Sequence, residues 1–444
     1  MRAALAALAA ALALVAPAPA AAALGPDELD LVEERRLSER LRELAFRTAA
    51  IDGVTRVRVL LPAGYERRPR RRWPVLYLLH GGFGSYRDWT ESGAAEAITA
   101  EAPLIVVMPD TGITGGYTDW HNHGRGGPPM WETYHLRQLV PWIDRRYRTV
   151  AGRAGRAIAG ASMGGGGAMT YAARHPDLFA AAASFSGAVD TNNPLVWPLT
   201  EFDGWNVGRP GARYGSRLTQ EVRWRGHNPA DLATNLAGLH LTVRTGTGLP
   251  AATGGLSVVE LAVWLQNRSF HRRLSELGIP HAWHEGPGRH DWPDWQRALR
   301  ALVAELPAVF ADPPAPPREL RFRAIEPAYE VFGWRVRIAR PALEFSELRA
   351  TGGRFSLRGS GRATVTTPPR WRPGAAATVE VVSGEGRRRL RLRVGADCRL
   401  RIDVPLGPGN PVQQYTLAAR LRGRREHTTH VTVRARRGCP REAR

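Results

Sequence analysis

The sequence predicts an α/β domain with a mostly parallel central sheet and helices on both faces, followed by an all-β, sandwich-like domain. Between residues 73 and 306, unbroken apolar runs typical of buried strands alternate with helical segments, which favours a parallel sheet covered on both sides. Residues 312–319 then form a proline-rich linker. Beyond the linker, short segments with alternating apolar and polar residues, separated by Gly and Pro, indicate antiparallel strands.

The elements of the first domain, residues 24–311, can be assigned in order. Two strands at 38–47 and 54–61 flank Asp52-Gly53, which is a hairpin signal. Apolar runs predict further strands at 73–79, 104–109, 156–161, 180–186, 239–245 and 281–285. Helical periodicity predicts helices at 131–147, 164–175, 257–277 and 291–306. Because the carboxyl ends of parallel strands share one edge of the sheet, we expect ligands to bind there.

Two further regions complete the domain plan. Residues 187–238, between two sheet strands, are predicted to form a cap-like insertion. Its aromatic residues would either stack on a sugar or aryl group or form a small core of their own: Trp197, Phe202, Trp205, Tyr214 and Trp224. The β domain spans 320–444, with strands predicted at 334–338, 354–357, 363–366, 378–382, 389–394 and 429–433.

Residues 1–23 have the pattern of a secretory signal peptide. One arginine precedes a short apolar stretch that ends in small residues. The stretch is too short for a comfortable membrane span, and no later stretch is long enough, so we expect a secreted or cell-envelope protein without a transmembrane segment. Export favours disulfide formation, and the two cysteines, Cys398 and Cys439, are predicted to form a disulfide.

The positive charge is concentrated in the β domain. The chain has no lysine, and residues 320–444 hold 27 arginines against 10 acidic residues, a net charge of +17. The remainder holds 35 arginines against 31 acidic residues. Two interpretations stay open: the β domain binds an anionic cell-envelope polymer, or the arginines form a solvated surface without a partner. Nucleic acid is a poor partner for an exported protein, so none is expected.

Ser162 is the predicted nucleophile. It lies in Gly160-Ala161-Ser162-Met163-Gly164, directly after the strand 156–161 and directly before a helix. This Gly-x-Ser-x-Gly pentapeptide in a strand–turn–helix context is the nucleophile elbow of α/β-hydrolases, where the serine hydroxyl is exposed on a sharp turn. Flanking glycines are needed because a side chain at either place would strike the neighbouring strand or helix. The first domain is therefore predicted to have the α/β-hydrolase fold.

The chain order Ser, acid, His of this fold places the general base in the loop before the last helix. His290 lies there, whereas His281 and His284 fall within the preceding strand and are weaker candidates. The acid is less well defined, because the turn after the strand 239–245 contains no carboxylate. Glu260, downstream of that turn, and Asp231, upstream of the strand, are the two candidates.

Two backbone N–H groups are expected to form the oxyanion hole. One is the amide of Met163, the residue after the nucleophile. The other is expected from the loop His80-Gly81-Gly82-Phe83, most readily from Gly82. Glycines in this loop let the backbone approach a substrate carbonyl.

Several segments together resemble the Putative esterase family of α/β-hydrolases, which includes esterase D, feruloyl esterases and the antigen 85 mycolyltransferases. The resemblance covers about residues 38–307 and rests on these segments: Trp73 to Gly84, Val106 to Pro109, Asp119-Trp120, Trp131 to Tyr134, Ala159 to Gly164 and His290 to Trp295. It is closest to the mycolyltransferases, whose acid is a helix glutamate, and this favours Glu260 over Asp231.

The resemblance also implies that Phe83 and Trp292 border the substrate. The chain differs from the mycolyltransferases where an aspartate and an arginine hold trehalose, because those positions correspond to His80 and Phe83. The position of their reactive cysteine corresponds to Thr245. The resemblance therefore implies formation of an acyl-enzyme rather than transfer of mycolate to trehalose.

We thus predict a secreted serine carboxylesterase or acyltransferase that acts on acyl or sugar esters, with Ser162, Glu260 and His290 as the triad. The alternative is a non-catalytic cell-envelope binding protein on a hydrolase scaffold. No cofactor or metal is expected: His121-Asn122-His123 has no further ligand at metal spacing, and the glycines at 164–167 lack a P-loop lysine.

Overall fold

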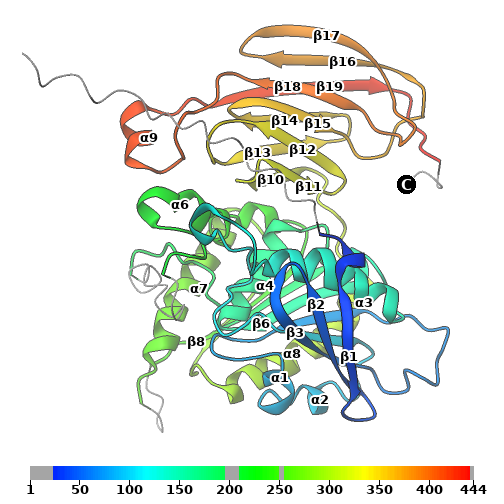
Figure 1. Ribbon diagram of the computed structural model, residues 1–444, viewed down its shortest axis with the longest axis vertical. Coiled ribbons are helices and arrows are strands. Elements are labelled where there is room, and N and C mark those ends of the chain that lie inside the picture. The colour runs from blue at the N-terminus through cyan, green and yellow to red at the C-terminus, as the bar shows by residue number, and fades with distance from the viewer. Residues whose placement is uncertain (1–23, 196–209, 250–254, 441–444) are drawn as a thin grey trace, which may run out of the picture.

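The computed structural model describes residues 24–195, 210–249 and 255–440. A nine-stranded sheet in the order β1-β2-β3-β5-β4-β6-β7-β8-β9 forms the centre of the first domain (Figure 1). Strands β5, β4, β6, β7, β8 and β9 are parallel to one another. The pairs β1–β2, β2–β3 and β3–β5 are antiparallel. The predicted α/β-hydrolase fold, with a mostly parallel sheet, is confirmed. The strands span Asp30–Arg36, Leu41–Thr48, Ile51–Leu60, Val75–Leu79, Ile105–Pro109, Arg156–Ala161, Ala181–Phe185, His240–Gly246 and Ala282–Gly286, for β1 to β9 in turn.

Helices cover both faces of this sheet because its strands carry apolar side chains on both. Along β4, Val75, Tyr77 and Leu79 join one apolar core, whereas Leu76 and Leu78 join the other. The first core also contains side chains of α3, α4 and α7, and the second contains side chains of α8. The helical elements are α1 (Asp88–Glu91), α2 (Ala95–Ile98), η3 (Thr133–Leu139, a π-helix), α3 (Val140–Arg146), α4 (Met163–Arg174), α6 (Arg217–Gly226), η6 (Ala233–Leu236), α7 (Val258–Glu276) and α8 (Trp292–Ala311), with short 3-10 turns at Pro26–Glu28 (η1), Asn122–Gly124 (η2) and Arg153–Gly155 (η4).

The structure adds a strand, β1, that the sequence analysis did not predict, because all of its side chains are exposed and give no burial pattern. The predicted signal peptide, residues 1–23, lies outside the described residues, as do Trp197, Phe202 and Trp205 of the cap-like insertion. Of the other aromatic residues named in the predicted insertion, Tyr214 and Trp224 pack on each other with ring centroids 5.0 Å apart. No helix in the described part of the chain is long and apolar enough to cross a membrane.

The second region is built from two antiparallel sheets. A six-stranded sheet has the order β10-β13-β14-β19-β16-β17, and a four-stranded sheet has the order β11-β12-β15-β18. Their inward side chains share one apolar core. The elements are β10 (Leu320–Ala324), β11 (Ala328–Val331), β12 (Trp334–Ala339), β13 (Ser346–Thr351), β14 (Arg354–Gly359), β15 (Gly361–Thr366), β16 (Ala376–Ser383), β17 (Gly386–Arg393), β18 (Arg401–Leu406), α9 (Leu417–Arg422) and β19 (His427–Ala435).

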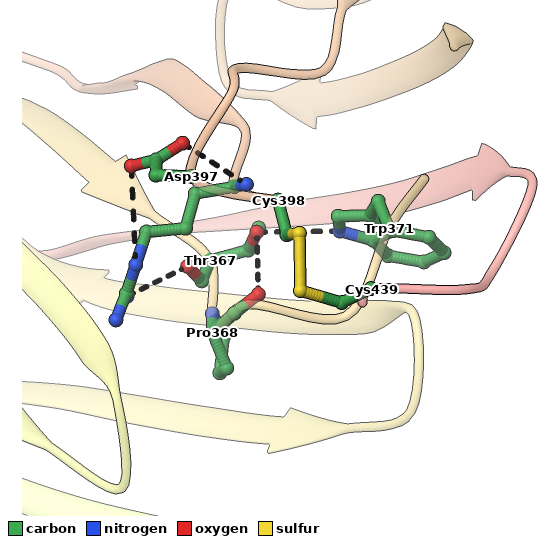
Figure 2. The surroundings of a disulfide bond; sticks show 7 residues. Thr367, Pro368, Trp371, Asp397, Cys398 and Cys439 are labelled. Atoms are coloured by element: carbon green, nitrogen blue, oxygen red, sulfur yellow. Dashed lines mark hydrogen bonds and ion pairs between the residues drawn. A yellow bond between two sulfur atoms is a disulfide. The ribbon is translucent and has the colours of Figure 1, made fainter. Parts of the chain in front are cut away.

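Cys398 and Cys439 form a disulfide at one end of this sandwich, with their Cα atoms 5.6 Å apart (Figure 2). Both residues are buried, and the Cys398 carbonyl accepts the backbone N–H of Trp371. Thr367 organises the same corner, because its hydroxyl accepts the indole N–H of Trp371 and the backbone N–H of Leu400. The disulfide ties the segment between β17 and β18 to the chain after β19.

The β domain packs tightly on the first domain rather than hanging from the linker. Ile325 and Phe345, from the β domain, belong to the first apolar core of the α/β domain. Asn235 of η6 donates to the Arg323 carbonyl and accepts the Arg323 backbone N–H, both at 2.8 Å. Asp177 accepts the backbone N–H of Phe332 at 2.9 Å. The two domains therefore share an apolar core and hydrogen bonds from side chains of the first domain to the main chain of the second.

A buried charge cluster joins helix α4, which begins directly after Ser162, to the β domain. Arg174, the last residue of α4, pairs with Glu132 at 2.9 Å and with Glu326 of the β domain at 2.7 Å. Burial alone would raise the pKa of both carboxyls, but the Arg174 guanidinium holds each pKa below its usual range. Since removing one partner leaves a buried charge unpaired, the cluster makes separation of the domains costly.

Candidate active site

The predicted nucleophile lies on a strained turn between β6 and α4. Ser162 has φ 56° and ψ −122°, a conformation that non-glycine residues rarely adopt. Its backbone N–H donates to the Phe185 carbonyl, and its carbonyl accepts the Gly166 and Ala188 N–H groups. These bonds hold the strained turn in place, as a nucleophile elbow requires.

The two glycines of the pentapeptide are required by close backbone contacts. A Cβ atom on Gly160 would lie 2.4 Å from the carbonyl carbon of Gly164. A Cβ atom on Gly164 would lie 2.4 Å from the Leu79 carbonyl oxygen at the end of β4. The steric reason given from the sequence therefore applies at both positions.

His290 comes from the loop between β9 and α8 and reaches Ser162. Its Nε2 atom lies 2.8 Å from Ser162 Oγ, and its Nδ1 atom lies 2.7 Å from Glu260 Oε2. The Trp295 ring packs edge-on against the imidazole, with centroids 5.0 Å apart. If Nδ1 carries the proton and donates to Glu260, Nε2 is free to accept the serine hydroxyl proton.

Glu260 is fully buried in the first turn of α7. Its Oε2 atom faces His290, and its Oε1 atom accepts from the Ser186 hydroxyl at 2.7 Å, the Thr245 hydroxyl at 3.2 Å and the Gly246 backbone N–H at 2.6 Å. A buried carboxylate is tolerated only when it is hydrogen-bonded in this way. Ser186 and Gly246 were not among the predicted site residues, although both lie at the carboxyl ends of strands, β7 and β8, where ligands were expected to bind.

The alternative candidates lie elsewhere. Asp231 accepts hydrogen bonds from Asn192, Asn228 and Arg225 within the cap region. His281 Nε2 lies 2.7 Å from His271 Nδ1 of α7, and His284 is exposed on β9. Among the residues that the structure describes, no group of three or more His, Cys, Asp or Glu side chains has the arrangement of a metal site.

The loop after β4 lies beside the nucleophile. A Cβ atom on Gly81 would lie 3.4 Å from Ser162 Cβ, and one on Gly82 would lie 3.9 Å from Met163 Cβ. The Phe83 N–H donates to the Ile113 carbonyl at 2.7 Å, so it is occupied. The amide of Met163 belongs to the first turn of α4, whose N–H groups have no partner within the helix. The loop that carries Gly82 therefore lies next to the first turn of α4, where Met163 begins the helix.

The side chain of buried His80 holds this loop in place through two hydrogen bonds. His80 Nε2 accepts the Thr111 N–H at 3.1 Å, which leaves Nδ1 to donate to the Gly81 carbonyl at 2.8 Å. The hydroxyl of buried Tyr117 donates to the His80 carbonyl at 2.8 Å. These bonds fix the peptide units that precede Gly82.

The two residues predicted to border substrate have different surroundings. The Phe83 side chain is 62% exposed near the nucleophile, and its backbone has φ 61°. Trp292 is partly buried, and its ring packs edge-on against Trp89 and Trp295, with centroids 5.2 and 5.1 Å apart. A cavity of about 320 Å³ is lined by Ser186, Thr245 and Gly246, which contact Glu260, and by Trp295, which contacts His290, among others.

A mostly parallel sheet with a serine on a strand–helix elbow is the architecture of the α/β-hydrolases. The family model described as Putative esterase matches residues 48–306, more than half of the chain. The chain therefore belongs to this family, as the sequence analysis predicted.

Curated relatives support the same assignment. Esterase Rv1288 of Mycobacterium tuberculosis is 38% identical over 289 residues, which cover 63% of this chain and 62% of that protein. The chain thus matches less than two thirds of the length of that relative. The diacylglycerol acyltransferase/mycolyltransferase Ag85B of Mycobacterium leprae is 29% identical over 250 residues, which cover 52% of this chain and 75% of that protein.

Solved structures give more distant matches. The crystal structure of Mycobacterium tuberculosis MPT51 matches 60% of this chain and 96% of its own, with 24% identity and a TM-score of 0.49. An S-formylglutathione hydrolase from Agrobacterium tumefaciens matches 64% of this chain and all of its own, with 17% identity and a TM-score of 0.47.

Proposed function

We propose that this chain is a secreted serine carboxylesterase or acyltransferase that works through a covalent acyl-enzyme. The observation that carries the proposal is the continuous relay from Ser162 Oγ to His290 Nε2 at 2.8 Å and from His290 Nδ1 to Glu260 Oε2 at 2.7 Å. Membership of an esterase family supports the reaction class. The named relatives, an esterase and an acyltransferase, support both possible outcomes, hydrolysis of an ester and transfer of its acyl group.

In the first half-reaction, Ser162 Oγ attacks the acyl carbon of the ester while His290 Nε2 takes its proton. The oxyanion that forms is stabilised by the Gly82 and Met163 N–H groups. Glu260 holds the imidazole in the right orientation and stabilises its protonated form. When the tetrahedral intermediate collapses, the bond to the leaving alcohol breaks and His290 returns the proton to the alcohol oxygen.

In the second half-reaction, a second hydroxyl compound attacks the acyl-enzyme. His290 removes a proton from it, the acyl–Ser162 bond breaks, and the proton returns to Ser162 Oγ. With water as acceptor the product is a free acid, and with a hydroxyl group of a sugar as acceptor the product is a new ester. We propose acyl or sugar esters as substrates, with Phe83 and Trp292 bordering them and exposed Phe83 available to contact an apolar acyl group.

The setting of the reaction is also a proposal. The signal-peptide pattern of residues 1–23 and the Cys398–Cys439 disulfide favour a secreted or cell-envelope protein. The net charge of +17 over residues 320–444 favours an anionic cell-envelope polymer as partner of the β domain.

Reaction with a fluorophosphonate, read by intact mass, tests the catalytic proposal directly. We expect a single adduct on the wild-type protein and none on Ser162→Ala. A screen of acyl esters with and without sugar acceptors then separates hydrolysis from transfer. Absence of any adduct on folded wild-type protein would favour the alternative, a non-catalytic envelope-binding protein on a hydrolase scaffold.

A further inference from the structure

One face of the β domain carries a group of exposed arginines on and beside its edge strand β17. The outward positions of the six-stranded sheet include Arg354 of β14, Arg434 of β19 and four residues of the edge strand β17: Arg387, Arg389, Arg391 and Arg393. We call these six residues the arginine face; all six are exposed. Leu390 and Leu392 of β17 point the other way, into the sandwich core. Figure 1 shows β17 on the side of the sandwich farthest from the α/β domain.

The strand register places these arginines in rows across the sheet. Thr378 of β16 pairs with Arg391 on one side and with Arg434 on the other. In the next row, Glu380 pairs with Arg389 and with Thr432, which in turn pairs with Arg354. Alternate residues on one strand lie about 6.8 Å apart, so the four arginines of β17 span about 20 Å. The result is an extended lattice of positive charge rather than a single pocket.

The charge of this face is largely uncompensated. Among the described residues, only Arg387 of the six has an acidic partner within 4 Å, Glu380 at 3.3 Å. Glu380 and Glu385 are the acidic residues of β16, β17 and the turn between them. A general preference for arginine codons does not account for this excess of positive charge, because the rest of the same chain balances 35 arginines with 31 acidic residues. Protection of an exposed sheet edge does not account for it either, since Arg354 and Arg434 lie on interior strands.

We propose that the arginine face binds an acidic polysaccharide, and that this polymer carries the esters on which the active site works. The second part rests on the proposed esterase or acyltransferase function. An extended lattice of guanidinium groups suits a linear polymer with repeated negative groups, because each group can accept paired hydrogen bonds from one arginine.

The neighbouring residues favour this partner over two others. A membrane surface is met by apolar side chains as well as by charge, but the exposed large apolar residues of the described β domain, Leu417 and Leu421, lie on α9. Single-stranded nucleic acid is bound by stacking on aromatic rings, but the outward positions of β14, β16, β17 and β19 hold no Phe, Tyr or Trp.

The test compares two triple variants of the full chain with equal loss of charge. Arg389→Gln/Arg391→Gln/Arg434→Gln alters the arginine face, whereas Arg67→Gln/Arg68→Gln/Arg70→Gln alters an exposed basic loop of the α/β domain. Polygalacturonate is the probe, with neutral dextran, anionic phosphatidylglycerol vesicles and oligo(dT) as comparisons. We expect wild type to prefer polygalacturonate, the face variant to bind about tenfold more weakly and the loop variant to stay within about twofold.

Equal losses in both triple variants would overturn the proposal, as would absence of polygalacturonate binding or tighter binding to vesicles or oligo(dT). Arg354→Gln/Arg434→Gln leaves the edge strand intact and gives a second measurement if the first face variant does not fold. Ser162→Ala must bind the polymer as wild type does, so a failure of the catalytic proposal stays distinguishable from a failure of this one. Expected binding weakens as salt rises, because surface charges are screened within ~10 Å at 0.1 M.

Discussion

Glu260 Oε1 accepts the backbone N–H of Gly246 at 2.6 Å, so the acid of the proposed triad is anchored to the carboxyl end of a sheet strand. The carboxylate itself comes from α7, fourteen residues later in the chain. The other oxygen is left to His290. The orientation of the general base therefore depends on how a helix packs against the sheet edge, and the predictions on the triad follow from this arrangement.

Replacement of the nucleophile is expected to abolish turnover without disturbing the fold. Ser162→Ala should lower kcat for a simple acyl ester by about 10⁴-fold or more, as when a triad serine is removed elsewhere. Initial rates with a chromogenic ester measure this, and thermal unfolding provides the control. Near-wild-type turnover in the variant would refute the catalytic role of Ser162.

Replacement of the acid separates the two candidates raised by the sequence. Glu260→Gln should lower kcat by roughly 10²-fold to 10⁴-fold, because the amide no longer holds the imidazole in the productive tautomer. Asp231→Asn, in the cap network, should change kcat by no more than about threefold. A larger effect at Asp231 than at Glu260 would remove Glu260 from the triad.

The domain contact predicts that the β domain stabilises the α/β domain. Ile325→Ala, which removes a side chain only 2% exposed in the shared core, should lower the free energy of unfolding by about 2–4 kcal/mol. Leu417→Ala, at a position 69% exposed, is the matched control and should have almost no effect. Equal melting temperatures for the two variants would show that the domains are not coupled.

The domain contact also bears on removal of the β domain. A β domain joined only by the proline-rich linker would be removable without harm to turnover on small esters. Because truncation at Asp312 removes Ile325 and leaves Arg174 without Glu326, we expect the shortened protein to unfold at a clearly lower temperature than the full chain. Ester hydrolysis after mild heating compares the two.

Acid should destabilise the protein partly through His135. Its ring is buried, with Nδ1 accepting from the Tyr171 hydroxyl and Nε2 donating to the Asp110 carbonyl, and burial lowers the pKa of His135 to about 4. Between pH 6.5 and 4 the unfolded chain takes up a proton at His135 that the folded chain does not. The free energy of unfolding therefore decreases as the pH is lowered through this range. The contribution is about 1.4 kcal/mol per pH unit.

Chemical unfolding at several pH values measures this slope. His135→Gln should reduce the slope by about that amount between pH 6.5 and 4.5, whatever its effect on stability at pH 7. An unchanged slope in the variant would show that His135 titrates in the folded protein as it does in the unfolded one.

Removal of the disulfide should weaken the β domain. Cys398 and Cys439 are 41 residues apart, and closing a loop of that length stabilises by about 2–4 kcal/mol. Cys398→Ser/Cys439→Ser should therefore unfold at a lower denaturant concentration than wild type. Wild type treated with a reductant is the matching comparison and should shift in the same direction.

The sequence was most informative where burial leaves a pattern. Continuous apolar runs predicted strands that lie within about two residues of β4, β5 and β6. β1 was missed because it is exposed along its whole length. The candidate nucleophile and base could be chosen from local sequence, since Ser162 directly follows β6 and His290 lies in the short loop after β9.

The acid could not be placed in that way. The turn after β8 has no carboxylate, and what brings Glu260 to His290 is the packing of α7 against that turn, a long-range relationship that residue spacing does not encode. Family resemblance supplied what the local pattern lacked. The Asn235, Ile325 and Arg174 contacts between the domains were likewise invisible, because each joins segments far apart in the chain.

Helix α4 begins at the residue after Ser162 and ends at Arg174, whose guanidinium grips Glu326 of the β domain. The length of α4 thus helps to set the separation between the Ser162 hydroxyl and the β domain that carries the arginine face. Because this separation is fixed, a polymer must exceed a minimum length to contact Ser162 and the arginine face at the same time. Short oligomers would then be processed like free esters, and a gain in apparent affinity would begin only above a threshold degree of polymerisation, which a length series of one polymer would reveal as a step rather than a slope.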